Sequence, residues 1–225
     1  MKIPLVLISG LLSNRRIWQH QIDHLSDIAD IHIISPSQNT PQKMVQTILD
    51  AVPAKFALAG HSMGGWLCLE VMKVIPSRVT KLCLINTTWR MDSEEKKARR
   101  QKLICQAENG EFSKIAKELA THFVFNPLVK TDVEKMFLEV GKEAFIRQET
   151  AMLERCESHS ILSQITCPTL VIHAMQDAIF SLEEHQELAN QIRGAQLAVV
   201  ENSGHMSPIE RPEIITSLLK SWLAD

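Results

Sequence analysis

One stretch organises the chain, Ala59-Gly60-His61-Ser62-Met63-Gly64-Gly65. A short apolar run of strand length, residues 56–59, precedes it. Residues 66–75 follow and are apolar almost all round, as a buried helix is. A serine between glycines at a strand-to-helix corner matches the pattern G-x-S-x-G, which lifts the hydroxyl clear of the sheet. The sequence therefore predicts a nucleophile elbow with Ser62 at its tip.

The spacing of the glycines has a steric reason. A turn this sharp brings backbone segments close together and leaves no room for a side chain two residues before or after the serine. Positions 60 and 64 are therefore both glycine. The hydroxyl of Ser62 would stand at the positive end of the following helix.

Composition narrows the class of protein. With 45% apolar and 22% charged residues in 225, the chain fits one globular domain, or one domain with a sizeable insertion. A net charge of -2, no tyrosine and 5% aromatic residues argue against nucleic-acid and membrane-surface partners. The five cysteines are odd in number and lack C-x-x-C spacing, which favours free thiols in a reducing compartment.

The N-terminal segment could be mistaken for a signal peptide. Residues 3–8 are apolar, but one lysine precedes them and no A-x-A-like cleavage site follows. The same residues supply a strand that the fold needs, and no run approaches membrane-spanning length. We therefore expect a cytoplasmic protein.

Strand-like and helical segments alternate along most of the chain. Short links join them in the order β-α-β-α-β-α-β up to residue 85, which argues for a parallel sheet covered on both faces. Strand pattern returns late in the chain, where Ser181 and Glu184 form a capping-box pair and Pro212 opens a closing helix. The predicted strands lie at 3–8, 31–34, 56–59, 79–85, 169–173 and 197–200.

Between residues 87 and 161 no convincing strand occurs. Helical stretches are predicted at roughly 93–108, 111–122, 131–140 and 143–156. The charge run at 92–100 is interpreted as a solvated helix face with an i,i+4 pair, Glu95–Arg99, the alternative being a basic substrate-binding patch.

A serine hydroxyl needs a base to take its proton, and that base must itself be oriented. In a doubly wound sheet, catalytic groups sit at the carboxyl ends of strands. Asp177 and His205 both lie just past predicted strands, and the chain order Ser62, Asp177, His205 is the one typical of a G-x-S-x-G elbow.

Other titratable residues fit less well. Asp92 and Asp132 are rival acids, but both fall in the helical insertion. His173 lies within a strand and is interpreted as a buried structural residue. His20 and His24 are spaced i,i+4 as metal ligands can be, but no third ligand is near in sequence.

Three segments together resemble the α/β-hydrolase superfamily, in particular its small microbial esterases, enol-lactonases and cofactor-free haloperoxidase-like proteins. Residues 60–64 match the nucleophile elbow, and residues 168–177 resemble the acid segment that begins P-T-L and ends in Asp. Residues 204–213 resemble the histidine segment G-H…E-x-P-E. The resemblance covers essentially the whole core, and the insertion corresponds to the family's variable cap.

The resemblance implies an α/β-hydrolase fold with a trimmed N-terminus. Its doubly wound, parallel sheet would have six strands in the order 2-1-3-4-5-6. The core would comprise residues 1–87 and 161–225, and the cap residues 88–160.

The resemblance also implies a role for each site residue. Ser62 would attack, His205 would shuttle the proton and Asp177 would orient and stabilise the imidazolium. The N–H of Met63, directly after the nucleophile, and that of Leu11, in the loop that matches the family's H-G-x segment, would form the oxyanion hole.

Two departures from the family's pattern affect the loops around the site. Ser9 replaces the usual histidine of the H-G-x loop, and residues 35–39 replace the stretch D-x-P-G-x-G-x-S. The pocket wall should therefore differ here.

The resulting prediction is a serine hydrolase that cleaves a small carboxylic ester or related acyl compound through an acyl-enzyme, without metal or cofactor. Thioesterase, lactonase and C–C hydrolase activities remain open because the same triad serves all of them. A non-catalytic ligand-binding protein is the alternative from another class, and the sequence does not separate a monomer from a homodimer. The expected pocket lining is Leu12, Trp89, His122, Phe123, Phe125, Ile179 and Phe180.

Overall fold

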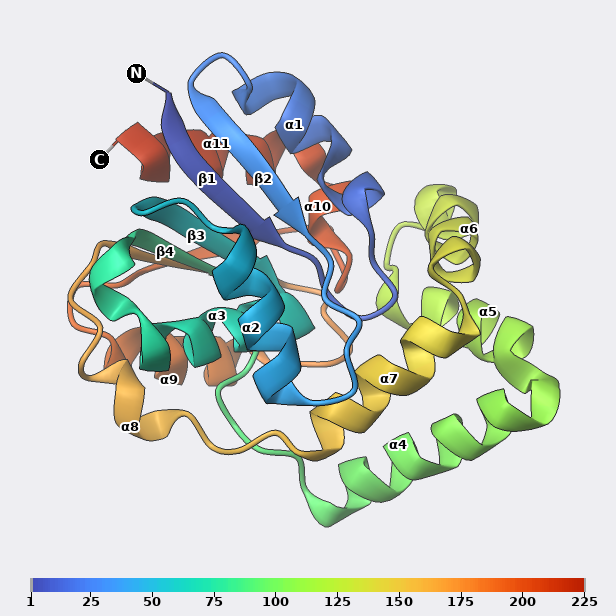
Figure 1. Ribbon diagram of the computed structural model, residues 1–225. Coiled ribbons are helices and arrows are strands. Elements are labelled where there is room, and N and C mark those ends of the chain that lie inside the picture. Colours follow the sequence, from blue (N-terminus) through green and yellow to red (C-terminus); the bar gives the residue numbers. More distant parts are fainter. Residues whose placement is uncertain (1, 225) are drawn as a thin grey trace.

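The computed structural model describes residues 2–224 and, within them, forms one sheet of six parallel strands (Figure 1). The strand order is β2-β1-β3-β4-β5-β6, as predicted from the sequence. Strands β3 and β5 are buried along their whole length because helices cover both faces. The strands are β1 (Ile3–Ile8), β2 (Ala29–Ile34), β3 (Phe56–His61), β4 (Val79–Ile85), β5 (Thr169–Ala174) and β6 (Gln196–Val200).

Helices pack on both faces of this sheet. Helix α1 contacts α11, whereas α2 contacts α3 on the opposite face (Figure 1). The capping box of Ser181 and Glu184 opens α9, as predicted, and Pro212 occupies the first turn of α11. The bounds are α1 (Gln19–Leu25), α2 (Pro41–Ala51), α3 (Met63–Val74), α8 (His159–Leu162), α9 (Leu182–Gln191), α10 (Ser207–Glu210) and α11 (Pro212–Ala224).

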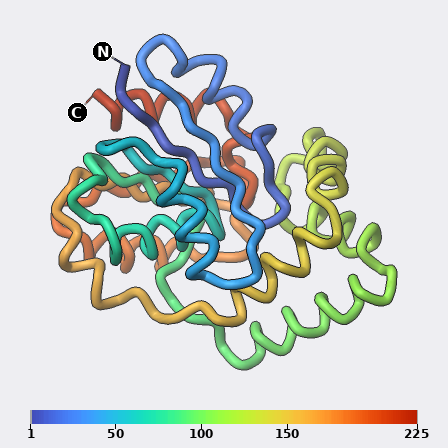
Figure 2. Tube along the Cα trace, viewed as in Figure 1, coloured from blue at the N-terminus to red at the C-terminus, as the bar shows by residue number. Residues whose placement is uncertain are grey.

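Between β4 and β5, four helices of more than ten residues precede the short helix α8. They are α4 (Glu94–Gln106), α5 (Phe112–Phe123), α6 (Lys130–Val140) and α7 (Lys142–Leu153). Each begins within one residue of its predicted start. Figure 2 shows this segment, green to yellow, as one group beside the sheet, and in Figure 1 it lies toward the arrowheads of β1 and β2.

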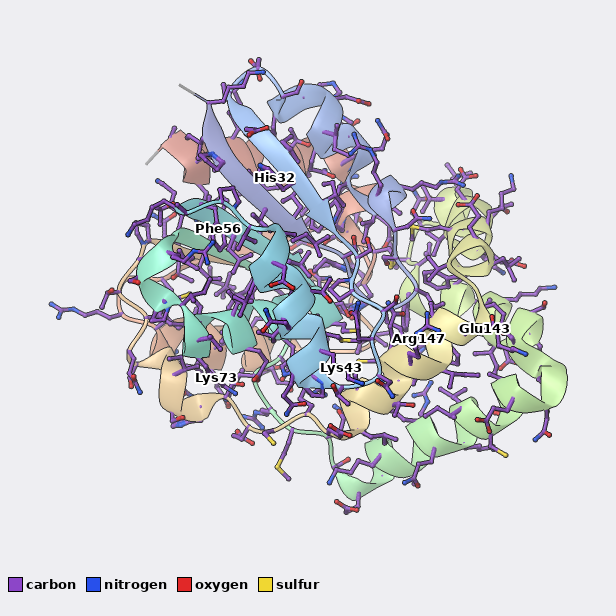
Figure 3. All side chains as sticks on the ribbon, in the orientation of Figure 1. His32, Lys43, Phe56, Lys73, Glu143 and Arg147 are labelled. Carbon is purple, nitrogen blue, oxygen red and sulfur yellow. The ribbon has the colours of Figure 1, made fainter. Side chains whose placement is uncertain are left out.

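Helix α7 is tied to the loops that follow β1 and β2. Gln148 donates to the carbonyl oxygen of Pro36 at 2.8 Å and accepts from the N–H of Leu12 at 3.0 Å. Arg147, labelled in Figure 3, donates to the carbonyl oxygen of Ser37 at 2.6 Å. The insertion is therefore held against the carboxyl edge of the sheet.

Local details refine the N-terminal helix. A 3-10 turn, Arg15–Trp18, precedes α1, and the side chain of Asn14 caps this turn by accepting from the N–H of Arg16. His20 and His24 stack on each other with ring centroids 3.9 Å apart. Within residues 2–224 no three histidine, cysteine or acidic side chains converge as metal ligands would. No helix in that range has the length and apolarity that a bilayer crossing requires.

Candidate active site

Ser62 sits at a strained corner between β3 and α3. Its φ of 55° and ψ of -118° lie in a region that costs a non-glycine residue about 1–3 kcal/mol. The flanking structure enforces this conformation. The N–H of Ser62 donates to the carbonyl oxygen of Ile85 at 2.9 Å, and the carbonyl oxygen of Ser62 accepts from the hydroxyl of Thr87 at 2.7 Å.

The glycines of the elbow are sterically required, as the sequence predicted. A Cβ on Gly60 would lie 2.3 Å from the carbonyl oxygen of Gly64, and one on Gly64 would lie 2.2 Å from that of Ile8. Gly65, which the sequence did not single out, is equally constrained because its Cβ would lie 2.6 Å from the Cβ of Thr87. The backbone at the end of β1 and the loop that follows β4 therefore pack directly against this turn.

Ser62, His205 and Asp177 form one hydrogen-bonded chain. The Nε2 atom of His205 lies 2.8 Å from the hydroxyl of Ser62, and Nδ1 lies 2.9 Å from a carboxylate oxygen of Asp177. A carboxylate only accepts, so Nδ1 carries the proton and Nε2 is left to accept from the serine. The side chains of His205 and Asp177 are 2% and 0% exposed, so water does not compete for these bonds.

Asp177 stays charged despite its burial. Burial alone would raise the pKa of Asp177, but the neighbouring His205 and the N–H of Ile179 hold that pKa below its ordinary value. The Ile179 N–H donates to the second carboxylate oxygen at 2.8 Å. The side-chain amide of Asn86 donates to the first oxygen at 3.1 Å. Asn86 directly follows β4, so its place at a strand end was the signal that could have identified it.

The backbone of His205 is held by two segments distant in sequence, and its ring is flanked by two aromatic side chains. Its N–H donates to the carbonyl oxygen of Phe123 at 2.8 Å, and its carbonyl oxygen accepts from Nε2 of His61 at 2.7 Å. The rings of Phe123 and Phe180 lie 5.0 and 5.7 Å from the imidazole, centroid to centroid. The imidazole is therefore held by both the core and the helical insertion.

Glu210 joins the histidine loop to the end of α5. One carboxylate oxygen accepts from the N–H groups of Phe125 and Asn126, both at 2.8 Å, and the other from the N–H of Met206 at 3.1 Å. Burial raises the pKa of Glu210, although these backbone donors oppose the rise.

The loop after β1 packs against the elbow. A Cβ on Gly10 would lie 3.1 Å from the Cβ of Ser62, so the adjacent residue Leu11 is close to the nucleophile. Within residues 2–224 neither the N–H of Leu11 nor that of Met63 donates to a protein acceptor. Ser9, where the family has histidine, accepts instead from the hydroxyl of Ser35 at 2.9 Å, so the loop is braced differently.

A cavity of about 250 Å³ adjoins these residues. Leu11, Phe123 and Phe180 lie in its wall and also border the hydrogen-bonded chain. His122 and Ile179 line it too, so four of the seven predicted pocket residues do so.

Three predicted pocket residues do not line this cavity. Leu12 and Trp89 are packed in the core at 0% and 2% exposure. Phe125 is 51% exposed because Glu210 holds its backbone outside the cavity wall. In place of Leu12, it is Leu11 that faces the cavity.

Six further residues of the wall are charged, whereas the sequence interpretation had a basic patch only as its alternative. The residues concerned are Asp92, Lys96, Arg99, Arg100, Glu149 and Arg155. Arg100 donates to Asp92 and to Glu149, both at 2.6 Å, and Arg155 also pairs with Asp92. The predicted pair Glu95–Arg99 does not form within the described residues. Most of α4 is exposed, as predicted for a solvated helix, but Lys96, Arg99 and Arg100 also belong to the cavity wall.

The rival acids and base lie elsewhere. Asp92 is held in the ion-pair cluster, and Asp132 is exposed on α6, 3.8 Å from Lys135. His173 is buried in β5, where its ring lies 4.6 Å from that of His185.

Comparison with known proteins agrees with this architecture. The family profile described as "alpha/beta hydrolase fold" matches residues 3–212. Over 243 aligned residues the chain is 25% identical to (E)-2-((N-methylformamido)methylene)succinate hydrolase of Acinetobacter baylyi, covering 98% of this chain and 90% of the relative.

Two solved structures superpose with a TM-score of 0.89. One is a thermophilic esterase from Thermogutta terrifontis with malate bound, 26% identical, with 100% of this chain and 90% of the esterase covered. The other is the enol-lactonase from Burkholderia xenovorans, 22% identical, with 100% and 92% covered, which shows the shared fold. On the family match and the fold, the chain belongs to the alpha/beta hydrolase family and is a hydrolase.

Proposed function

We propose that this protein is a serine hydrolase that cleaves small carboxylic esters through an acyl-enzyme. The observation that carries the proposal is the buried chain from the Ser62 hydroxyl through His205 to Asp177, with bonds of 2.8 and 2.9 Å, on a strained elbow. A non-catalytic binding protein would have no physical use for this arrangement.

In the proposed reaction, Nε2 of His205 takes the proton of Ser62 as its oxygen attacks the acyl carbon. The N–H groups of Met63 and Leu11 stabilise the oxyanion that develops. His205 then gives the proton to the leaving alcohol, and Asp177 stabilises the imidazolium in between. Water, activated by His205, releases the acid and restores Ser62.

The surroundings support an ester of modest size. A cavity of about 250 Å³, whose wall includes the two aromatic rings that flank the imidazole of His205, suits a short acyl group. The esterase among the superposed structures and the hydrolase of a succinate derivative both act, by their names, on carboxylic acid derivatives. We further propose that α4 to α7 act as a cap over the site, with residues 88–160 as the cap and the remainder as the core.

Labelling with a fluorophosphonate probe tests the nucleophile. We expect stoichiometric labelling that peptide mapping places on Ser62 and that is lost in His205→Ala. A panel of p-nitrophenyl esters of increasing chain length would then size the pocket, with Ser62→Ala reducing turnover by about 10³-fold or more. A folded protein that neither labels nor turns over any ester would overturn the proposal and favour a binding protein.

A further inference from the structure

Helix α4 presents one face to the cavity. Lys96, Arg99, Arg100 and Leu103 all line it, and their spacing of i, i+3, i+4 and i+7 places them on one stripe of the helix. Three of these four side chains are cations. This stripe of the cavity wall is therefore basic.

The acidic residues of the cavity are already paired. Asp92 and Glu149 are almost fully buried and neutralise Arg100 and Arg155. Lys96 and Arg99 form no ion pair with any carboxylate within residues 2–224. The cavity wall thus keeps two positive charges that the protein itself does not neutralise.

Lys96 lies over an aromatic ring that also neighbours the imidazole of His205. The ammonium of Lys96 is 6.0 Å from the centroid of the Phe180 ring, and that ring is 5.7 Å from the imidazole of His205. Arg99 follows Lys96 by about one turn of α4 and acts electrostatically on His122, a neighbour in the same wall. Leu11, whose neighbour Gly10 packs against Ser62, lines the same cavity.

We propose that Lys96 and Arg99 form an anion-binding subsite and that the acyl substrate carries a carboxylate at the end remote from the bond that is cleaved. The inference rests on the proposed function. The guanidinium of Arg99 can hold a carboxylate with two parallel bonds, and Lys96 adds a mobile point charge. Leu103, Leu119 and Ile179 offer an apolar wall for the methylene chain between the two polar ends.

Two matched esters test this directly. The p-nitrophenyl monoester of adipic acid carries a free carboxylate. Its neutral counterpart is methyl p-nitrophenyl adipate, in which that carboxylate is converted to a methyl ester. We expect kcat/KM to favour the anionic ester by about tenfold, chiefly through KM, and the preference to shrink with added salt. Lys96→Gln/Arg99→Gln should abolish the preference by lowering kcat/KM for the anionic ester to the level of the neutral ester.

The matched control removes the same charge from the same helix. Lys97→Gln/Lys102→Gln alters two lysines that do not line the cavity, so the preference should survive. A wild-type enzyme without preference, or a control that loses as much as Lys96→Gln/Arg99→Gln, would overturn the subsite.

A binding measurement separates this inference from the proposed reaction. Calorimetry with Ser62→Ala protein should detect adipate and not the neutral diamide adipamide, and adding Lys96→Gln/Arg99→Gln should remove the signal. Adipate binding without turnover of either ester would refute the hydrolase but retain the subsite. Turnover of the neutral ester without adipate binding would retain the hydrolase and refute the subsite.

Discussion

At the scale of single residues, the site depends on one unfavourable backbone conformation. The strain at Ser62 persists because the carbonyl oxygen of Ile85 and the hydroxyl of Thr87 hold both of its backbone polar groups. Gly60 and Gly64 leave room for the backbone to close on it. These contacts fix the serine hydroxyl at 2.8 Å from His205 before any substrate binds.

Asp177 is the residue whose proposed role can be tested with the smallest change. In Asp177→Asn the amide no longer requires a proton on Nδ1, so Nε2 is free to carry it and cannot accept from Ser62. We expect kcat to fall by about 10³- to 10⁴-fold with little change in KM. Steady-state kinetics and the rate of fluorophosphonate labelling would measure the loss.

Asp132→Asn is the matched control, because that carboxylate is exposed on α6 and touches none of these groups. It should retain wild-type kinetics. If Asp177→Asn remained folded and fully active, Asp177 would not be the orienting acid.

At the scale of elements, contacts remote in sequence hold the site together. Gln148 of α7 reaches Leu12, 136 residues away in the chain, and so supports the loop that contains Leu11. Glu210 of α10 reaches Phe125 and Asn126 at the end of α5. No local pattern in the sequence encodes such partners, although the E-x-P-E segment marks Glu210 itself.

Glu210 should act as a positioning residue. Glu210→Gln leaves one carboxamide oxygen for three backbone donors, and its NH₂ group then faces N–H groups. We expect a loss of stability of about 1–3 kcal/mol and a lower kcat, because His205 and Phe123 lie on the two segments it joins. Urea unfolding and kinetics at several temperatures would separate the two effects.

Glu213→Gln provides the comparison, since Glu213 lies exposed in the first turn of α11. Its stability should stay within about 0.5 kcal/mol of wild type. If Glu210→Gln and Glu213→Gln had the same stability and the same kcat, Glu210 would not be a positioning residue.

At the scale of the whole molecule, the sequence was most informative where position along the chain dictates position in space. Alternating strands and helices joined by short links are compatible with only a few sheet topologies. The carboxyl ends of parallel strands lie at the same edge of the sheet. The elbow and the placing together of Ser62, Asp177 and His205 follow from these rules, whereas the strand order was implied by the resemblance to the α/β-hydrolase superfamily.

The cavity wall was less predictable for a physical reason. Helix α4 has no buried residue within its bounds, so its pattern gives no apolar stripe to show which face meets the core. Lys96 and Arg99 could therefore not be distinguished from solvated charges. Trp89 and Phe125 were expected in the wall as aromatic residues of the insertion, and their type alone did not reveal where they pack.

Two buried histidines should govern how stability depends on pH. Burial lowers the pKa of His61 to about 3, and burial together with His185 lowers that of His173 to about 4. In the unfolded chain a histidine titrates near pH 6.5. Below that pH the unfolded state binds protons that the folded state does not, so stability falls as pH decreases toward 4.

His173→Phe removes one of these groups while keeping a flat ring in the buried site beside His185. Between pH 6.5 and 4, the slope of unfolding free energy against pH should become shallower by up to about 1.4 kcal/mol per pH unit. Urea unfolding at half-unit pH steps measures it, with His173→Asn as a second variant if the larger ring is not accommodated. His159→Gln, exposed at the start of α8, should keep the wild-type slope. An unchanged slope in both His173 variants would mean that His173 does not contribute to the acid sensitivity of the fold.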